Sequence, residues 1–334
     1  GIGGKIFCIL ICIILGVGSF YIGKVNNAFQ KITGSNKKTS SMVVAVKADD
    51  NADTLSAAAG YTFGVQYATG GDQTKSAVKQ IEKELGQNIT LQEYSNLGEE
   101  AQALYDGEVD AIIYNSAYSN IIKEQYSTFT KDTKVIYKHN IVVEIESDTS
   151  DESVTKPFAV YLSGIDTNGD ITEQGRSDVN IVAVVNPTSH QVLLITTPRD
   201  YYVPIPGVSG GQDDKLTHAG IYGVDVSMQT LEELYDTDIE FFGRVNFTSM
   251  TSVVDALGGL DVESDLEFDT GWESGAEIHV NEGMNHFDGI SALAFCRERQ
   301  ALPDGDNGRG VHQQAVITAI IKKMMSPAML RGAS

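Results

Sequence analysis

The sequence predicts an α/β protein whose main domain is a mixed central sheet flanked by helices, preceded by a small α/β accessory domain and a transmembrane helix. Two observations carry this prediction. Apolar runs of strand length alternate with segments of helical periodicity on both sides of a polar stretch, and an uncharged apolar run lies near the N-terminus. The length of 334 residues leaves room for about two domains, and a hydrophobic content of 42% is enough to build their cores.

The first predicted element is a membrane anchor at 1–24. Residues 6–23 carry no charge and lie between Lys5 and Lys24, and a helix of that length reaches about 27 Å, close to the apolar thickness of a bilayer. A cleaved signal peptide is the alternative, but no small-residue cleavage site follows the apolar run cleanly. Residues 25–42 are predicted to form a polar linker next to the membrane.

The accessory α/β domain is predicted at 43–146. Strand-like runs alternate there with helical spacing of apolar residues, which is typical of a small α/β unit. The expected strands are 61–67, 89–94 and 109–114, and the expected helices are 74–85 and 99–104. Thr69-Gly70-Gly71 precedes the first helix; we interpret it as a helix-entry turn in preference to an anion site, because Walker spacing is absent.

The main domain is predicted at 157–334, after a polar linker at 147–156. Two apolar runs begin it, and a third run follows a turn rich in Asn, Pro and Ser, so it is expected to pair antiparallel with the second. These strands are expected at 158–165, 179–185 and 192–197, and helices at 224–234, 247–257 and 311–325.

Composition excludes several classes of protein. The formal charge of −21 opposes binding to nucleic acid phosphates or to an anionic membrane surface. The three cysteines include Cys8 and Cys12 inside the apolar run, so no disulfide framework is expected, and no zinc-ligand spacing is present. Cys296 is expected to be a small buried residue.

Arginine usage separates the two folded units. All seven arginines follow residue 175, and Arg297, Arg299 and Arg309 fall within thirteen residues. A guanidinium binds phosphate or carboxylate through two parallel hydrogen bonds, which lysine cannot imitate. Arg297 and Arg299 alternate, and we expect them to share one strand face. The alternative is that each arginine pairs with a surface carboxylate.

Two carboxylates lie at the ends of predicted strands. Asp166 ends the first strand of the main domain, and Asp178 directly precedes the second. Paired carboxylates of this kind can hold a hard cation such as Mg²⁺ through oxygen ligands. The alternative is an ordinary turn-forming role, which Asp166 beside Thr167-Asn168-Gly169 would also fit.

Six sequence blocks in order resemble the LytR-CpsA-Psr family, and they extend from about 158 to 325. The preceding anchor and extra α/β unit make the chain most similar to the members that act in capsule biosynthesis. The blocks are GRSD at 175–178, TPRDYYVPIPG at 197–207, DKLTHAG at 214–220, VDALGGLDV at 254–262, FDGISALAFCRER at 287–299 and GDNGRGVHQQ at 305–314.

The resemblance implies a membrane-anchored transferase with its folded domains outside the cell. Such an enzyme moves a capsule or other cell-wall glycopolymer from a polyprenyl-pyrophosphate carrier to peptidoglycan, forms a phosphodiester, uses Mg²⁺ and has possible pyrophosphatase side activity. The implied pyrophosphate ligands are Arg176, Arg199, Lys215, Arg297, Arg299, Arg309 and Gln313; the implied metal ligands are Asp166 and Asp178; and the implied catalytic residues are Asp178, Arg199 and Asp306.

Two features of this chain bear on that resemblance. His312 stands where the family commonly has a basic residue before the glutamine pair, and the main domain is expected to be truncated at its C-terminus. A helix face could line a channel for the lipid tail, although ordinary core packing predicts the same pattern. That face consists of Phe247, Met250, Val253, Val254 and Leu257.

Two other functions compete with the enzyme. A non-catalytic membrane scaffold or regulator would use the accessory domain to bind other capsule-assembly proteins, and a transcriptional attenuator would need DNA contacts. The net charge of −21 and the predicted anchor oppose the attenuator. The clustered arginines favour the enzyme, because a scaffold does not require them.

Overall fold

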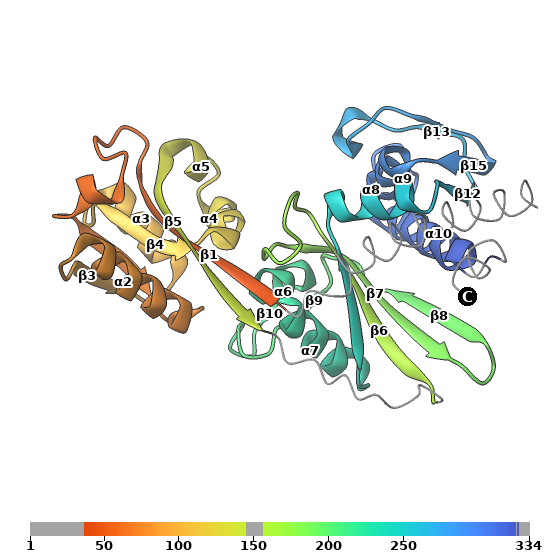
Figure 1. Ribbon diagram of the computed structural model, residues 1–334, viewed down its shortest axis with the longest axis horizontal. Helices are drawn as coiled ribbons and strands as arrows, with labels where there is room; N and C mark the ends of the chain where they lie inside the picture. The colour runs from red at the N-terminus through yellow and green to blue at the C-terminus, as the bar shows by residue number, and fades with distance from the viewer. Residues whose placement is uncertain (1–36, 145–155, 325, 327–334) are drawn as a thin grey trace, which may run out of the picture.

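The computed structural model describes residues 37–144, 156–324 and 326, and it contains two separate main sheets (Figure 1). The expected anchor at 1–24 and nearly all of the expected linker at 147–156 lie outside the described residues. Within the described ranges, no helix is long and apolar enough to cross a membrane.

The first sheet has five strands in the order β3-β2-β4-β1-β5. Strand β2 is parallel to β3 and β4, whereas β1 is antiparallel to both β4 and β5. The strands are β1 (Lys37–Lys47), β2 (Thr62–Gln66), β3 (Thr90–Tyr94), β4 (Ala111–Asn115) and β5 (Thr133–Glu144). The helices are η1 (Leu55–Ala58), α2 (Gly71–Leu85), α3 (Leu97–Asp106), η2 (Ser116–Tyr118), α4 (Ser119–Gln125) and α5 (Phe129–Asp132).

Strand β1 corrects the predicted linker at 25–42, because residues 37–42 already belong to the sheet. The sequence there is polar, and the side chains of Thr39, Ser40 and Ser41 are nevertheless buried because they have hydrogen-bond partners. The hydroxyls of Ser40 and Ser41 donate to Gln174 and Asn140, each at 2.9 Å. Hydrogen bonding therefore permits a polar strand where apolar patterning predicts none.

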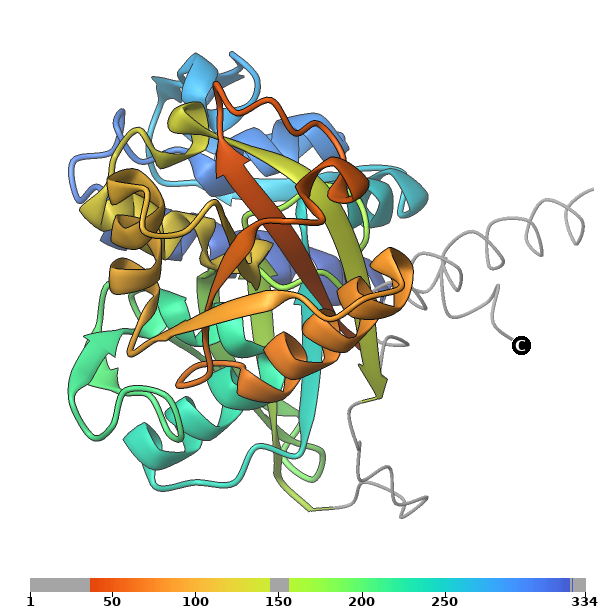
Figure 2. The same cartoon turned by 90° about the vertical axis from the view of Figure 1, so that its left-hand side faces the viewer.

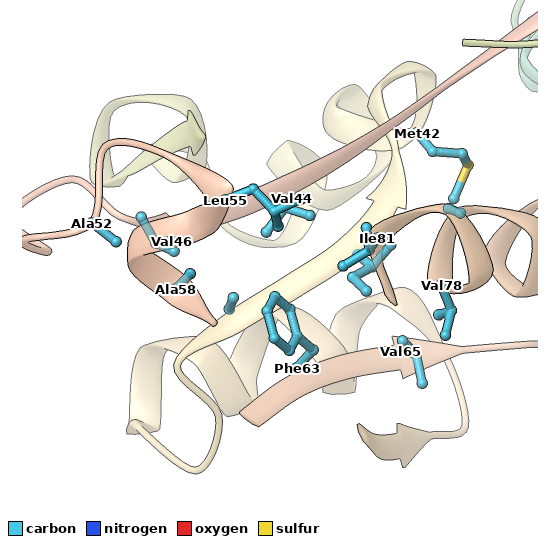
Figure 3. Packing of buried hydrophobic residues seen from close by; sticks show 13 residues of the cluster. Met42, Val44, Val46, Ala52, Leu55, Ala58, Phe63, Val65, Val78 and Ile81 are labelled. Atoms are coloured by element: carbon cyan, nitrogen blue, oxygen red, sulfur yellow. The ribbon is translucent and has the colours of Figure 1, made fainter. Parts of the chain in front are cut away.

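Apolar residues of β1, β2, β4 and α2 form the core on one face of the first sheet (Figure 3). Phe63 and Val65 of β2 are fully buried and face Ile81 of α2. Helix α2 ends at Gly86, whose φ of 66° is readily adopted only by glycine. The 3.6-residue spacing of apolar side chains thus places α2 on the sheet as predicted.

The second sheet has four strands in the order β11-β6-β7-β8. It is mixed, as predicted, because β11 is parallel to β6 while β6, β7 and β8 are antiparallel. The polar turn after β7 gives the antiparallel pairing that the sequence predicts for β8. The strands are β6 (Phe158–Ile165), β7 (Ser177–Asn186), β8 (Gln191–Thr196) and β11 (Phe241–Val245).

Helices cover both sides of the second sheet (Figure 1). Tyr161 and Val182 pack against Leu216 and Leu231 on one side, and a second core joins the remaining helices to a short ribbon. The helices are α6 (Leu216–Tyr222), α7 (Val224–Tyr235), α8 (Phe247–Ala256), η3 (Trp272–Ser274), α9 (Gly289–Arg297) and α10 (Asp306–Met324). The ribbons pair β9 (Tyr202–Pro204) with β10 (Asp213–Lys215), β12 (Leu260–Ser264) with β15 (Gly283–Phe287), and β13 (Phe268–Asp269) with β14 (His279–Val280).

Helix α6 lies unusually close to β7 because Gly220 has no side chain. A Cβ at Gly220 would lie 2.6 Å from the backbone nitrogen of Ser177 and 2.8 Å from the carbonyl oxygen of Gly175. No real side chain tolerates such contacts with backbone. The glycine of the DKLTHAG block therefore fixes the distance between α6 and the strand that carries Asp178.

The two units meet at a junction made of hydrogen bonds and aromatic contacts. Strand β1 reaches the second unit, where the backbone N–H of Thr39 donates to the carbonyl of Thr172 at 2.9 Å. The rings of Tyr118 and Tyr222 are 5.6 Å apart across the junction. Viewed along the long axis, the first unit lies directly in front of the second (Figure 2).

Candidate active site

A cavity of about 470 Å³ opens between the end of the second sheet and the helical layer. The sheet supplies one wall through the C-terminal end of β6, the start of β7 and the loop after β8. The helical wall comes from the start of α8, the end of α9 and the first half of α10. Seven of the predicted site residues line this cavity: Asp166, Asp178, Arg199, Arg297, Arg299, Arg309 and Gln313.

On the sheet wall, Asp178 is held by two donors. Arg199 Nη1 lies 2.7 Å from Asp178 Oδ2, and the hydroxyl of Thr217 donates to Oδ1 at 3.1 Å. Burial by itself would lower the pKa of the Arg199 guanidinium. The negative charges of Asp178, Asp200 and Asp306 have the larger combined effect, so the pKa is raised. Both carboxylate oxygens of Asp178 are therefore already engaged by protein donors, which hold the side chain in place at the cavity wall.

The carboxyl group of the neighbouring Asp166 has a raised pKa. Burial and the negative charge of Asp178 raise the pKa of Asp166 to about 6, although Arg176 and Arg199 oppose the shift. Arg176 Nη2 is 3.8 Å from Asp166 Oδ2, too far for a hydrogen bond. Asp166 therefore binds a proton more readily than an ordinary aspartate does, beside a partner carboxylate that is paired with Arg199.

Helix α10 places Arg309 and Gln313 on the helical wall. The two residues are four positions apart and so share one face of the helix. Asp306, one turn before Arg309, forms an ion pair with it at 2.7 Å and lines a small side pocket next to the main cavity. The predicted catalytic residue Asp306 thus orients Arg309 from outside the cavity.

Arg297 and Arg299 both line the cavity, but the expected shared strand face is wrong. Arg297 is the last residue of α9, and Arg299 follows in a loop. The Arg297 guanidinium lies 4.4 Å from the centre of the Phe247 ring and donates to the carbonyl of Ser274. The Arg299 side chain is exposed and has no ion pair or hydrogen bond to any residue that the structure describes, so it is free to bind a ligand.

Glu298, between these two arginines, is a positioning residue that sequence reasoning missed. It is 2% exposed, and its carboxylate accepts five hydrogen bonds. Burial alone would raise its pKa, but the hydrogen bonds lower that pKa to about 2. The donors are the backbone N–H groups of Gly271, Arg299, Gln300 and Ala301 and the hydroxyl of Ser274. The carboxylate therefore ties together the two loops that hold Arg297 and Arg299.

Two predicted pyrophosphate ligands lie elsewhere. Arg176 contacts Asp166 without lining the cavity. Lys215 lies at the junction of the two units, where its Nζ is 3.9 Å from Glu124 of the first unit. Lys215 is the last residue of β10, directly before α6, and the direction of the chain at this point places its side chain at the junction. No local sequence pattern indicates that direction.

The helix face predicted to line a lipid channel lies partly at the cavity and partly in the hydrophobic core. Phe247 and Met250, in the first turn of α8, line the cavity. Val253, Val254 and Leu257 belong to the core with α9 and α10. The apolar wall of the cavity therefore comes from one turn of α8, together with Val179, Val245 and Leu293.

His312 and Cys296 belong to the packed interior. The His312 ring stacks on Phe295 with centroids 4.0 Å apart, and burial lowers the pKa of its imidazole. It therefore favours the neutral form and does not replace a basic residue. Cys296 is buried, as predicted, and burial raises the pKa of its thiol to about 12.

Known proteins resemble this chain over the same region. TagU of Bacillus cereus strain AH820, named a polyisoprenyl-teichoic acid–peptidoglycan teichoic acid transferase, is 34% identical over 227 residues, or 68% of this chain and 69% of that protein. The crystal structure of protein gbs0355 from Streptococcus agalactiae has a TM-score of 0.50 and 26% identity, covering 56% of this chain and 67% of that one. YwtF (TagT) with bound octaprenyl pyrophosphate lipid has a TM-score of 0.42 and 29% identity, covering 57% and 78%.

Residues 111–334 match the LytR_cpsA_psr family. The match begins in β4, so it includes the last two strands of the first sheet as well as the whole second sheet. It covers more than half of the chain and contains every residue that lines the cavity. The chain belongs to the LytR-CpsA-Psr family.

Proposed function

We propose that this protein transfers a cell-wall glycopolymer from a polyprenyl-pyrophosphate carrier to peptidoglycan. One observation carries the proposal: four guanidinium groups, those of Arg199, Arg297, Arg299 and Arg309, line a single cavity in a chain of net charge −21. A cluster of that kind fits a ligand with several adjacent phosphoryl oxygens. The name of the B. cereus relative, a teichoic acid transferase acting on peptidoglycan, supports the same reaction.

The reaction requires a peptidoglycan hydroxyl to attack the phosphorus that carries the polymer. The new P–O bond makes a phosphodiester, and the bond from the attacked phosphorus to the oxygen that bridges the two phosphorus atoms breaks. Polyprenyl phosphate leaves, and the proton of the hydroxyl passes to this leaving phosphate or to water. Arg299 and Arg297 bind the phosphoryl oxygens, and Arg199 and Arg309 offset the charge that grows on the leaving phosphate. The apolar turn of α8 at Phe247 and Met250 accommodates the first part of the lipid tail.

Mg²⁺ fits the carboxylate pair on the sheet wall. Asp166 and Asp178 line one cavity, and burial together with the negative charge of Asp178 raises the pKa of Asp166. Magnesium commonly takes one or two carboxylates and completes its shell with water and phosphate oxygens. When bound, the ion would supply positive charge to the pyrophosphate. The described residues contain no group of three or more acidic, His or Cys side chains able to hold a metal, so substrate oxygens and water would be needed as further ligands.

The test of this proposal separates metal chemistry from an architectural role. Asp178→Asn keeps an acceptor for Thr217 but loses the charge, so transfer should fall more than lipid binding. Transfer rates of wild type and Asp178→Asn are measured with and without a chelator, beside lipid affinity. Chelator-insensitive transfer by both proteins would remove Mg²⁺ from the mechanism.

We further propose a membrane-anchored protein with its folded units outside the cell and the first unit as an accessory module for capsule-assembly partners. The alternative is a non-catalytic scaffold, whose cellular function would follow the first unit and ignore the arginines. Arg199→Ala decides between them. Loss of polymer attachment in cells and of transfer in vitro supports the enzyme, whereas intact attachment in cells supports the scaffold.

A further inference from the structure

A second cavity, of about 160 Å³, lies at the junction of the two units, away from the arginine cluster. Thr69, Gly70 and Tyr118 line it from the first unit, and Gln174, Gly207 and Tyr222 line it from the second. None of the residues that the structure places along this cavity is charged. Several of its polar groups are hydrogen-bond donors that have no acceptor among the described residues.

The N-terminus of α2 opens into this cavity. Gly70 is the N-cap, with a φ of 68° and no side-chain cap, and the first intrahelical bond runs from Thr74 N–H to its carbonyl. The N–H groups of Gly71, Asp72 and Gln73 therefore have no acceptor in the helix. Helix α2 has 15 residues, so its dipole adds positive potential at this end.

The hydroxyl of Tyr118 is a second, independent sign of a ligand. Tyr118 is 5% exposed, and its hydroxyl has no hydrogen-bond partner among the residues that the structure describes. That oxygen lies 3.0 Å from the point where a Cβ on Gly70 would stand. The hydroxyl therefore faces the cavity and the uncapped end of α2 and is available to a ligand there.

The amide of Gln174 supplies the third donor, and a chain of hydrogen bonds fixes its orientation. Asn115 Oδ1 accepts from the backbone of Ala117, so Asn115 Nδ2 must donate, and it does so to Gln174 Oε1 at 2.9 Å. Ser40 donates to the same oxygen. Gln174 Nε2 is left with two N–H groups and no acceptor in the described chain, on a residue that is 9% exposed and lines the cavity.

We propose that this cavity binds one oxyanion, such as a phosphate or carboxylate group. The lining offers several donors without a partner among the described residues, namely helix N–H groups, the Gln174 amide and a tyrosine hydroxyl that can also donate. Gln73 also lines the cavity, with its Oε1 3.3 Å from the point where a Cβ on Gly70 would stand. The side chain of Asp72 is 95% exposed and points away into solvent, so it does not fill the anion's place. A bound oxyanion would accept from residues of both units and hold them together. This site does not depend on the transferase function.

Glycine amides permit a test on the full chain. The full-length protein, labelled with ¹⁵N-glycine in detergent micelles, is titrated with inorganic phosphate at constant ionic strength. Gly70 and Gly71 report the junction cavity, while Gly271, which lines the main cavity, reports the arginine cluster. Acetate distinguishes a carboxylate preference from a phosphate preference, and chloride serves as the non-oxyanion control.

We expect saturable shifts of Gly70 and Gly71 with phosphate or acetate, and not with chloride. Tyr118→Phe should weaken that binding about tenfold or more while leaving the Gly271 response unchanged. Tyr114→Phe is the matched control, because Tyr114 is buried in the same core and bonds to Ser119 outside the cavity. Unchanged Gly70 and Gly71 signals, or equal affinity in Tyr118→Phe, would show that the cavity holds only water. If phosphate shifts Gly70 and Gly71 but not Gly271, the result would count against the proposed transferase site and not against the junction cavity.

Discussion

Glu100 in the first unit and Glu298 in the second are both buried, but their carboxyl groups are in opposite electrostatic states. Glu100, on α3, is 1% exposed, and burial raises its pKa well above the ordinary value although the backbone of Ile113 opposes the shift. Glu298 is 2% exposed, and its five hydrogen bonds hold its pKa at about 2. One carboxyl favours the neutral form, and the other stays ionised.

This difference shows how the two units use charge. The first unit has no arginine in its sequence and packs around apolar strands, so a charge in its core has nothing to pair with. In the second unit, buried charge is matched by backbone donors or by an opposite charge, and the matching groups build the cavity. For these two glutamates, burial therefore disfavours the charge of Glu100, whereas the hydrogen bonds of Glu298 outweigh it and fix the loops around the cavity.

The largest effect is expected at Arg299, whose guanidinium is free and lines the cavity. Arg299→Ala should weaken binding of polyprenyl pyrophosphate by roughly 10- to 150-fold, and Arg299→Lys should restore charge but only part of the affinity. Calorimetry on the folded variants measures this. Lys75→Ala, an exposed cation of the first unit, is the control and should bind as wild type does. Wild-type affinity in both Arg299 variants would contradict the assignment.

The next effect concerns Glu298. Glu298→Gln places an amide opposite donors that need an acceptor, so unfolding free energy should fall by about 2 kcal/mol and lipid affinity should fall with it. Because folding lowers the pKa of Glu298 from 4.5 to about 2, its stabilisation is present above pH 4.5 and is lost as pH falls toward 2. Urea unfolding from pH 7 to pH 3 should therefore show the two proteins converging at acid pH. A constant difference would exclude this role of the carboxylate.

Glu100 should respond with the opposite sign. Its raised pKa means that its contribution to stability is greatest below 4.5 and is lost as pH rises toward the folded-state value. Glu100→Met should therefore stabilise the protein at pH 8 by about 1 kcal/mol and have a smaller effect at pH 5. The same unfolding assay applies, with the exposed Glu99→Met on the same helix as control. Destabilisation at pH 8 would mean that Glu100 has a partner.

The smallest effect is expected at Lys215. Its side chain is about half exposed and contacts Glu124 across the junction instead of the cavity. Lys215→Met should change stability by no more than about 0.5 kcal/mol and leave lipid affinity within about twofold. The calorimetric assay used for Arg299 measures it. A large loss of affinity would place Lys215 in the binding site.

Strong periodicity made much of the fold predictable. Strand β6 has the predicted bounds, and α7 and α8 begin at the predicted residues, because alternating or 3.6-residue apolar patterns decide those elements. Helix α10 begins five residues before the predicted start. Gly308 and Gly310 weaken the helical signal there, and Gly310 is tolerated because α10 packs closely against Thr196 of β8.

The candidate site was predictable in composition but not in arrangement. Arginine chemistry and the motif blocks indicate seven residues that do line one cavity. Local pattern could not show that Arg297 ends a helix, that Phe247 supports it from α8, or that Lys215 faces the other unit. These relations depend on contacts between segments about 50 to 90 residues apart in the chain, which periodicity within a single segment does not report.

Helix α10 imposes a rule on sequence change in this protein. Arg309 and Gln313 line the cavity, while Gln314 Nε2 donates to Thr196 of β8 at 2.7 Å. The orientation of all three side chains therefore depends on the same helical segment. One residue inserted between Arg309 and Gln313 would rotate everything after it by about 100° and turn Gln313 away from its ligand. A point substitution in this segment changes the contacts of one side chain, whereas an insertion or deletion changes those of every residue after it. Tolerated differences in length between related proteins should therefore fall in the loop before α10.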